Sequence, residues 1–104
     1  MRLDLGFHQD LARGELLFSV HTHAAGLYIV ASGRIMLSVG NLDAGLKVVR
    51  LAEAGDLLGL TATLLGNTTL STAEALVDSN VLMLPRDALL ERAQRDAQLA
   101  LALA

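Results

Sequence analysis

Short apolar runs separated by turn residues fill the middle of the chain. In residues 34–39, Ile35, Leu37 and Val39 alternate with less apolar neighbours, which is the period of a strand with one buried face. Turn signals such as Ser32-Gly33 recur every ~8–12 residues, a spacing typical of an antiparallel sandwich or barrel. We expect strands over residues 15–20, 27–31, 34–39, 46–52, 72–77 and 81–84.

Both ends of the chain show a different pattern. Leu3, Phe7 and Leu11 fall at four-residue spacing and predict a short amphipathic helix within residues 1–13. After Pro85, whose fixed φ suits a helix start, the period becomes helical. The apolar stripe of this second predicted helix, over residues 86–104, consists of Leu89, Leu90, Ala93, Ala97, Leu101 and Ala104. Because the stripe is still apolar at the last residue, we expect a fragment of a longer polypeptide or a disordered end.

Residues 55–75 contain the most distinctive chemistry of the chain. They begin with Gly55-Asp56, have a second glycine at Gly59 and end in a run of small polar side chains. Gly59 permits a sharp turn, and Thr61 is placed to cap one helical turn over residues 62–65. A loop that leads into a helix N-terminus presents backbone N–H groups to an anion or a polar ligand. A plain strand–turn–helix connection explains the same residues.

Composition excludes several classes of function. The 104 residues form one domain, with 53% hydrophobic and 18% charged residues and enough length for a real core. The absence of cysteine excludes disulfides, thiolate zinc sites and a cysteine nucleophile. The net charge of −3 and the scattered basic residues give no stripe for nucleic acid. Without a membrane span or a signal-peptide pattern, we expect a soluble, cytoplasmic domain that makes no membrane contact.

Four segments in order resemble the sensor domain of the catabolite-activator and fumarate–nitrate-regulator (Crp/Fnr) family of bacterial transcription regulators. They read GELLF (14–18), GLYIVASGRIML (26–37), LAEAGDLLGLTATLLG (51–66) and TAEALVDSNVLMLPRDALL (72–90). The resemblance implies a mainly β fold, an eight-stranded antiparallel, jelly-roll-like β-roll with short helices.

The resemblance also implies a division of the chain and a partner. Residues 1–13 would be the N-terminal segment, 14–85 the roll, and 86–104 the start of a dimerisation helix. A homodimer would then form through Leu89, Leu90, Ala93, Ala97 and Leu101. DNA would be bound only by a further domain that is absent from this chain.

In this family, residues 55–75 correspond to the effector pocket. Members that bind cyclic nucleotides carry Gly-Glu-Leu, a short helix and Arg-Ser/Thr-Ala, in which the glutamate takes the ribose hydroxyl and the arginine the cyclic phosphate. Here Gly59 matches the glycine, Leu60 replaces the glutamate, and Thr69 or Leu70 replaces the arginine. Realignment restores no arginine, because none lies between Arg50 and Arg86.

The two missing contacts would cost about 3–6 kcal/mol, or roughly 10²- to 10⁴-fold in affinity. We therefore expect an unknown small-molecule effector and no cyclic nucleotide bound in the usual mode. The resemblance assigns the ligand-binding positions to Gly59, Leu60, Thr61, Ala62, Thr69, Leu70, Ser71 and Thr72. A stand-alone small-molecule-binding domain with the same roll is the alternative.

Histidines offer a third possibility, a cupin-like metalloprotein. His21 and His23 form a His-x-His pair, but Leu27 and Tyr28 occupy the positions where a cupin needs a glutamate, and no later histidine follows. Two imidazoles without a third ligand make a weak metal site. We expect a solvated loop with neither metal nor haem cofactor.

The remaining polar residues have structural alternatives. Thr69, Ser71 and Thr72 either bond a ligand or satisfy strand backbone. Glu74 is expected to face solvent, with a pocket-facing carboxylate as the sharper alternative, and Asp56 to cap the turn after Gly55. No nucleophile–base set is recognisable, so no enzyme and no catalytic residues are expected.

Overall fold

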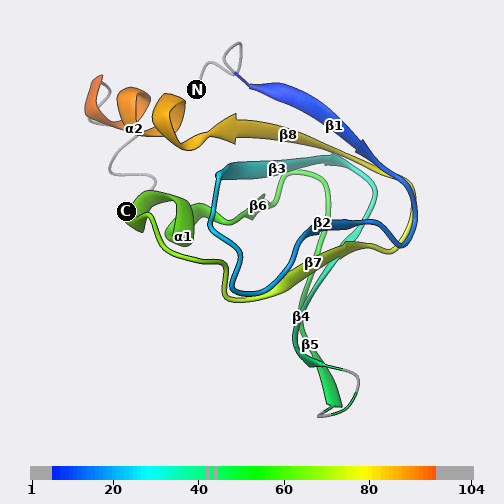
Figure 1. Ribbon diagram of the computed structural model, residues 1–104. Coiled ribbons are helices and arrows are strands. Elements are labelled where there is room, and N and C mark those ends of the chain that lie inside the picture. The colour runs from blue at the N-terminus through cyan, green and yellow to red at the C-terminus, as the bar shows by residue number, and fades with distance from the viewer. Residues whose placement is uncertain (1–5, 42, 44, 96–104) are drawn as a thin grey trace.

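The computed structural model describes residues 6–41, 43 and 45–95, and these form two four-stranded antiparallel sheets (Figure 1). One sheet has the order β1-β8-β3-β6 and the other β2-β7-β4-β5. The strands are β1 (Phe7–Leu11), β2 (Leu16–Phe18), β3 (Gly26–Ser32), β4 (Ile35–Asn41), β5 (Gly45–Ala52), β6 (Leu57–Leu58), β7 (Thr72–Ala75) and β8 (Ser79–Pro85); the helices are α1 (Leu60–Leu65) and α2 (Arg86–Arg95). The β-roll fold predicted from the sequence is confirmed.

The main core lies between the two sheets. Strand β7 shows the alternation: Ala73 and Ala75 are buried, while Thr72 and Glu74 lie on its other, partly exposed face. The buried cluster consists of Leu11, Val30, Ile35, Leu37, Ala52, Leu58, Ala73, Ala75 and Val81. Glu74 thus points away from the core, as the sequence predicted.

A second buried cluster joins the helices to the sheet of β3 and β8. Leu27 of β3 and Leu84 of β8 pack with Leu89 of α2, and all three are buried. Partly buried residues complete this cluster: Ile29, Leu57, Leu60, Leu64 and Ala88. Both helices therefore lie at the same end of the roll (Figure 1), held by a shared apolar contact.

Two strands escaped prediction. The helix expected within residues 1–13 is wrong for Phe7–Leu11, which form edge strand β1 paired with β8, with Phe7 opposite Met83 and Leu11 opposite Ser79. Strand β6 has only two residues and pairs with Tyr28 and Ile29 of β3. Neither helix in the described part of the chain reaches the length and apolarity that a membrane span requires.

Candidate functional site

Two glycines in the left-handed region delimit helix α1. Gly59 precedes the helix with φ 78° and Gly66 follows it with φ 69°. The Thr61 cap predicted from the sequence is wrong, because the helix begins at Leu60 and has no side-chain cap bond. At the other end, Asn67 N–H donates to Ala62 O at 2.9 Å and Gly66 N–H to Thr63 O at 3.3 Å, the bond pattern of a Schellman motif. Glycine is favoured at both positions because a side chain is strained there.

A cavity of about 330 Å³ opens beside α1, between the helix and the strands of the roll. Its lining includes seven of the eight positions that the resemblance assigned to ligand binding: Gly59, Leu60, Thr61, Ala62, Thr69, Leu70 and Ser71. Four further residues complete the described lining: Phe18 of β2, Leu37 of β4, Arg50 of β5 and Leu57 of β6. Its volume is at the lower end of the ~300–1,000 Å³ range of small-molecule pockets.

Two of the predicted hydroxyl residues are engaged in the fold itself. Thr69 is 5% exposed, and its hydroxyl donates to Ser19 O at 2.6 Å and accepts from Thr22 N–H at 3.2 Å. The Thr72 hydroxyl accepts from Val20 N–H at 2.9 Å. Thr69 ties the loop after β2 to the segment before β7, and Thr72 ties the same loop to the start of β7, so both hydroxyls satisfy backbone groups, as the structural alternative predicted. Thr72 does not line the cavity.

An arginine lines the cavity from a direction that the sequence did not indicate. Among the described lining residues Arg50 alone is charged, and it lies opposite Leu37 in the β4–β5 register, so that both reach the same side of the sheet. Its Nη2 lies 3.4 Å from Asp56 Oδ1, and its Nη1 donates to Leu57 O at 3.4 Å. Asp56 is itself held by the Glu53 N–H, 2.8 Å from its Oδ2. Asp56 caps a turn, as predicted, but this turn runs from Glu53 to Asp56 and contains Gly55, rather than following it.

A second, smaller cavity of about 140 Å³ adjoins the first. Phe18, Gly59 and Thr69 line both cavities, and Tyr28 and His23 line the smaller one. The rings of Phe18 and Tyr28 have centroids 5.9 Å apart. Burial raises the pKa of the Tyr28 phenol above its ordinary value, because desolvation disfavours the phenolate.

The two loop histidines are exposed and are held through their backbone. His21 N–H donates to Thr69 O at 2.9 Å, and His23 forms an isolated bridge with Thr68. Within residues 6–41, 43 and 45–95, no three His, Cys, Asp or Glu side chains gather in a group able to hold a metal ion. The backbone of this pair is therefore tied to the segment around Thr68 and Thr69.

Comparison with known proteins places the chain in a family. Residues 8–96 match the model of the cyclic nucleotide-binding domain. The chain therefore belongs to the cyclic nucleotide-binding domain family. No curated protein sequence matches it.

Solved structures agree with this assignment. The chain superposes on the catabolite activator protein of Thermus thermophilus with a TM-score of 0.87 and 26% identity, over 94% of this chain and 46% of that one. The sensor domain of the transcriptional regulator DNR of Pseudomonas aeruginosa gives 0.86 and 22%, over 97% and 68%. An EAL enzyme in a cAMP-bound form gives 0.79 and 18%, over 93% and 27%. The chain spans less than half the length of the first structures that it matches.

Proposed function

We propose that this chain is the effector-sensing domain of a Crp/Fnr-like bacterial transcription regulator. In this proposal, a small molecule in the 330 Å³ cavity changes the position of α1, and α1 passes the change to α2. The observation that carries the proposal is a direct bond between the two helices. Arg86, the first residue of α2, donates from Nε to Thr63 O of α1 at 2.8 Å.

Apolar packing supports the same path. Leu60 lines the cavity and also packs against the buried cluster that includes Leu89 of α2. A ligand that displaces Leu60 would therefore also change the packing around Leu89 of α2. The effect on α2 is limited to the difference between the ligand's affinities for the two arrangements of the helices.

Cyclic nucleotides bound in the usual mode fit this cavity poorly. Leu60 lines it at the glutamate position of the family's motif, and Thr69 or Leu70 at the arginine position, so neither the ribose hydroxyl nor the cyclic phosphate gains a charged partner from these residues. The one charged residue of the described lining, Arg50, belongs to β5 and precedes the cassette in the sequence, so it occupies neither of the two positions. A thermal-shift series with cyclic AMP and cyclic GMP at micromolar concentrations is expected to show no stabilisation.

The proposal includes a homodimer through α2, with an interface that differs from the predicted one at Leu89. Leu89, which the sequence assigned to a dimer interface, is 0% exposed within its own chain and cannot serve a partner. Leu90 is half-buried on α2, and Ala97 and Leu101 lie outside the described residues. We propose that a dimer contact begins at Leu90 and continues through Ala93, Ala97 and Leu101, with DNA bound by a separate domain of the regulator.

Native mass spectrometry combined with hydrogen exchange tests the sensing role. Wild-type protein purified from cells is expected to carry a bound small molecule, and its removal should raise hydrogen exchange in α2. Ala62→Leu fills the cavity and should abolish the added mass, whereas Leu65→Gln, on an exposed residue of the same helix, should retain it. Unchanged exchange in α2 on loss of the ligand contradicts the proposal.

A different output for the same sensor is the second candidate. The roll aligns with 27% of an EAL enzyme, so this fold also occurs within a protein described as an enzyme. A gel-shift assay on the full gene product, with its own promoter region as the probe, separates the two. Absence of any DNA complex would favour a sensor with another output.

A further inference from the structure

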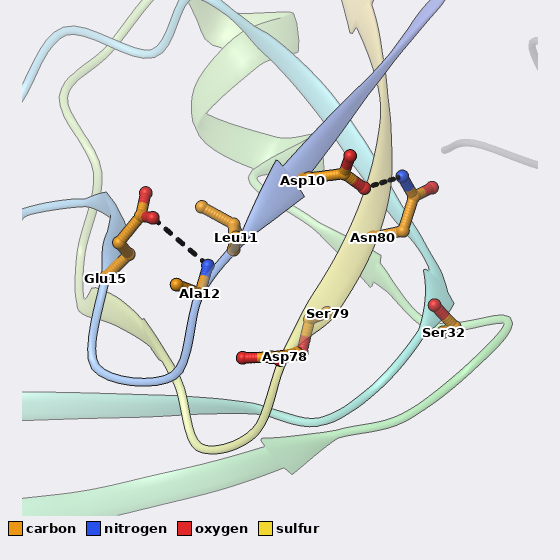
Figure 2. Close-up of a pocket in the computed structure, with 8 residues that line it drawn as sticks. All are labelled: Asp10, Leu11, Ala12, Glu15, Ser32, Asp78, Ser79 and Asn80. Carbon is orange, nitrogen blue, oxygen red and sulfur yellow. Dashed lines mark hydrogen bonds between the residues drawn. The ribbon is translucent and has the colours of Figure 1, made fainter.

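Acidic side chains gather at another hollow of the roll, and their bonds explain why they are there. This hollow, lined by β1, the loop after β1, the end of β3 and the start of β8 with the turn before it, contains Asp10, Glu15 and Asp78 (Figure 2). Asp10 accepts from Asn80 Nδ2 at 2.7 Å, Glu15 from Ala12 N–H at 3.1 Å and Asp78 from Arg13 N–H at 3.0 Å. Each carboxylate therefore fixes a strand or a turn, and the hollow gives no indication of a ligand.

The cavity beside α1 differs because its one charged side chain has donors to spare. A guanidinium has five N–H donors in a rigid plane. Within the described part of the chain, Arg50 makes two contacts, both at 3.4 Å, and its side chain is 47% exposed. Asp56 and Leu57 O hold the group in place at the cavity wall and leave donors for a ligand. A fixed arginine loses less entropy when it binds than a mobile one.

The rest of the lining specifies what the anion must be attached to. Phe18, Leu37 and Leu57 are apolar, as is Leu60 at the start of α1. Thr61 and Ser71 add hydroxyl groups that donate or accept hydrogen bonds. A ligand that satisfies both parts has one anionic end and one apolar body.

We propose that this cavity binds a small amphipathic monocarboxylate, with its carboxylate on Arg50 and its apolar body toward Phe18 and Leu37. The inference rests on the sensing role proposed above and names the ligand class for the same cavity. Arginine matches the two oxygens of a carboxylate with two parallel N–H bonds. The volume of about 330 Å³ accommodates a single aromatic ring or a medium-length acyl chain.

Asp56 selects against ligands of higher charge. Its carboxylate lies 3.4 Å from Arg50 and already neutralises part of the arginine's charge. The second negative charge of a dianion would be repelled by this carboxylate, and the described lining residues include no second cation to balance it. A monoanion needs only the remaining donors of Arg50. The cavity should therefore prefer a carboxylate to a phosphate monoester of the same shape.

Matched probes test the ligand class on the 104-residue chain. Phenylacetate and hexanoate are the carboxylates, phenylacetamide and hexanamide their neutral counterparts, and phenyl phosphate the dianion. Titrations followed by ¹H–¹⁵N NMR should give carboxylate affinities about 10- to 100-fold above those of the amides, the size of one charge-assisted contact. The resonances that shift should include Gly59, Thr61 and Ser71.

Variants separate Arg50 from arginines in general. Arg50→Gln should lose the 10- to 100-fold preference for carboxylates, and Arg50→Lys should keep part of it. Arg34→Gln is the control, since Arg34 also pairs with an acid, Glu53 at 3.6 Å, but does not line the cavity. All three variants should remain folded, because both arginines are substantially exposed.

Each result bears on one of the two proposals. Equal affinity for carboxylates and amides, an unaltered preference in Arg50→Gln, or no response to any carboxylate at millimolar concentration overturns the ligand class. In the first two cases the cavity can still sense another molecule. Arg50-dependent binding that leaves hydrogen exchange in α2 unchanged supports the ligand class and contradicts the sensing role.

Discussion

Arg86 Nε donates to the carbonyl oxygen of Thr63 at 2.8 Å, so the first residue of α2 holds the last turn of α1. The same carbonyl accepts the Gly66 N–H that ends the helix. Two lone pairs of one oxygen thus serve two donors, one from the cap of α1 and one from the start of α2. The end of α1, which lines the cavity, and the beginning of α2 are therefore joined at a single atom.

Removing this link should lower stability and loosen α1. Arg86→Leu loses one partly buried hydrogen bond from a charged donor, and we expect the free energy of unfolding to fall by about 1–2 kcal/mol. Hydrogen exchange at the Gly66 and Asn67 amides should rise more than in the core strands. Urea unfolding and exchange NMR measure the two effects. Arg13→Gln, on an exposed residue, is the control and should change neither.

Removing the buried hydroxyl of Thr63 in α1 should raise stability, in contrast to removing the Arg86 bond. Thr63 is 0% exposed, and its Oγ1 makes no hydrogen bond with any residue that the structure describes. Thr63→Val replaces this hydroxyl with a methyl group of similar shape and should raise the free energy of unfolding by about 1 kcal/mol. Thr63→Ala should lower it, because it removes the methyl group as well. If the valine variant is less stable than wild type, the hydroxyl has a partner such as a bound water.

The sequence pattern predicted strands with one buried face, such as β4. It missed β1 and β6, which are recognisable only from their backbone pairing with neighbouring strands. In β4, Ile35 and Leu37 alternate with partly exposed or small neighbours, so the period is visible. In β1 the residues before Leu11 are exposed, and the strand forms because its backbone pairs with β8. The spacing of Phe7 and Leu11 agrees with either structure, and no local signal decided between them.

The site shows the same division. The cassette positions form two short runs, Gly59 to Ala62 and Thr69 to Ser71, within one stretch of the sequence, and the resemblance located them at the cavity. Arg50 lies before the turn at Gly55, on a strand whose residues are exposed except for Ala52. Only its register opposite Leu37 brings it to the cavity, and register is a property of the folded sheet. Lys47 and Arg50 are both basic residues of this strand, and nothing in the sequence distinguished Arg50 from Lys47.

Thr69 and Leu70 are adjacent, yet substitution should affect them very differently. Thr69 is buried with both hydrogen-bonding directions of its hydroxyl in use, so Thr69→Val should cost about 1–3 kcal/mol of unfolding free energy. Leu70 is 77% exposed, and Leu70→Ala should stay within about 0.5 kcal/mol of wild type. Chemical unfolding of the two variants measures the contrast. Equal costs would mean that the Ser19 and Thr22 bonds do not stabilise the loop.

Tyr28 should make the fold sensitive to alkaline pH. Burial raises the pKa of its phenol, so the folded state favours the neutral form. This contribution is fully present below about pH 10, the pKa of an unfolded tyrosine, and is lost as pH rises through the folded pKa. The chain has one tyrosine and no tryptophan, so phenolate absorbance reports Tyr28 alone. Its midpoint should be higher in native protein than in urea, and coincident midpoints would contradict the effect of burial.

Restoring the family's two charged positions should create affinity for cyclic AMP at the expense of stability. Leu70 is the position able to accept the arginine, because it is exposed and lines the cavity, whereas the Thr69 hydroxyl holds the loop. Leu60 packs against the buried cluster of Leu27, Leu84 and Leu89, so a glutamate there should lower the free energy of unfolding by about 1–3 kcal/mol.

The double variant Leu60→Glu with Leu70→Arg tests this trade directly. We expect cyclic AMP to stabilise it in a thermal-shift assay and to bind it more tightly than wild type, by up to roughly 10²- to 10⁴-fold if both contacts form. Leu65→Glu with Leu70→Arg carries the same charges, but residue 65 does not line the cavity, so this control keeps the arginine contact, lacks the glutamate contact and should bind cyclic AMP about 10- to 100-fold less tightly than the first double variant. Equal responses of the two double variants would mean that charge alone, and not the position of the acid at residue 60, attracts the nucleotide.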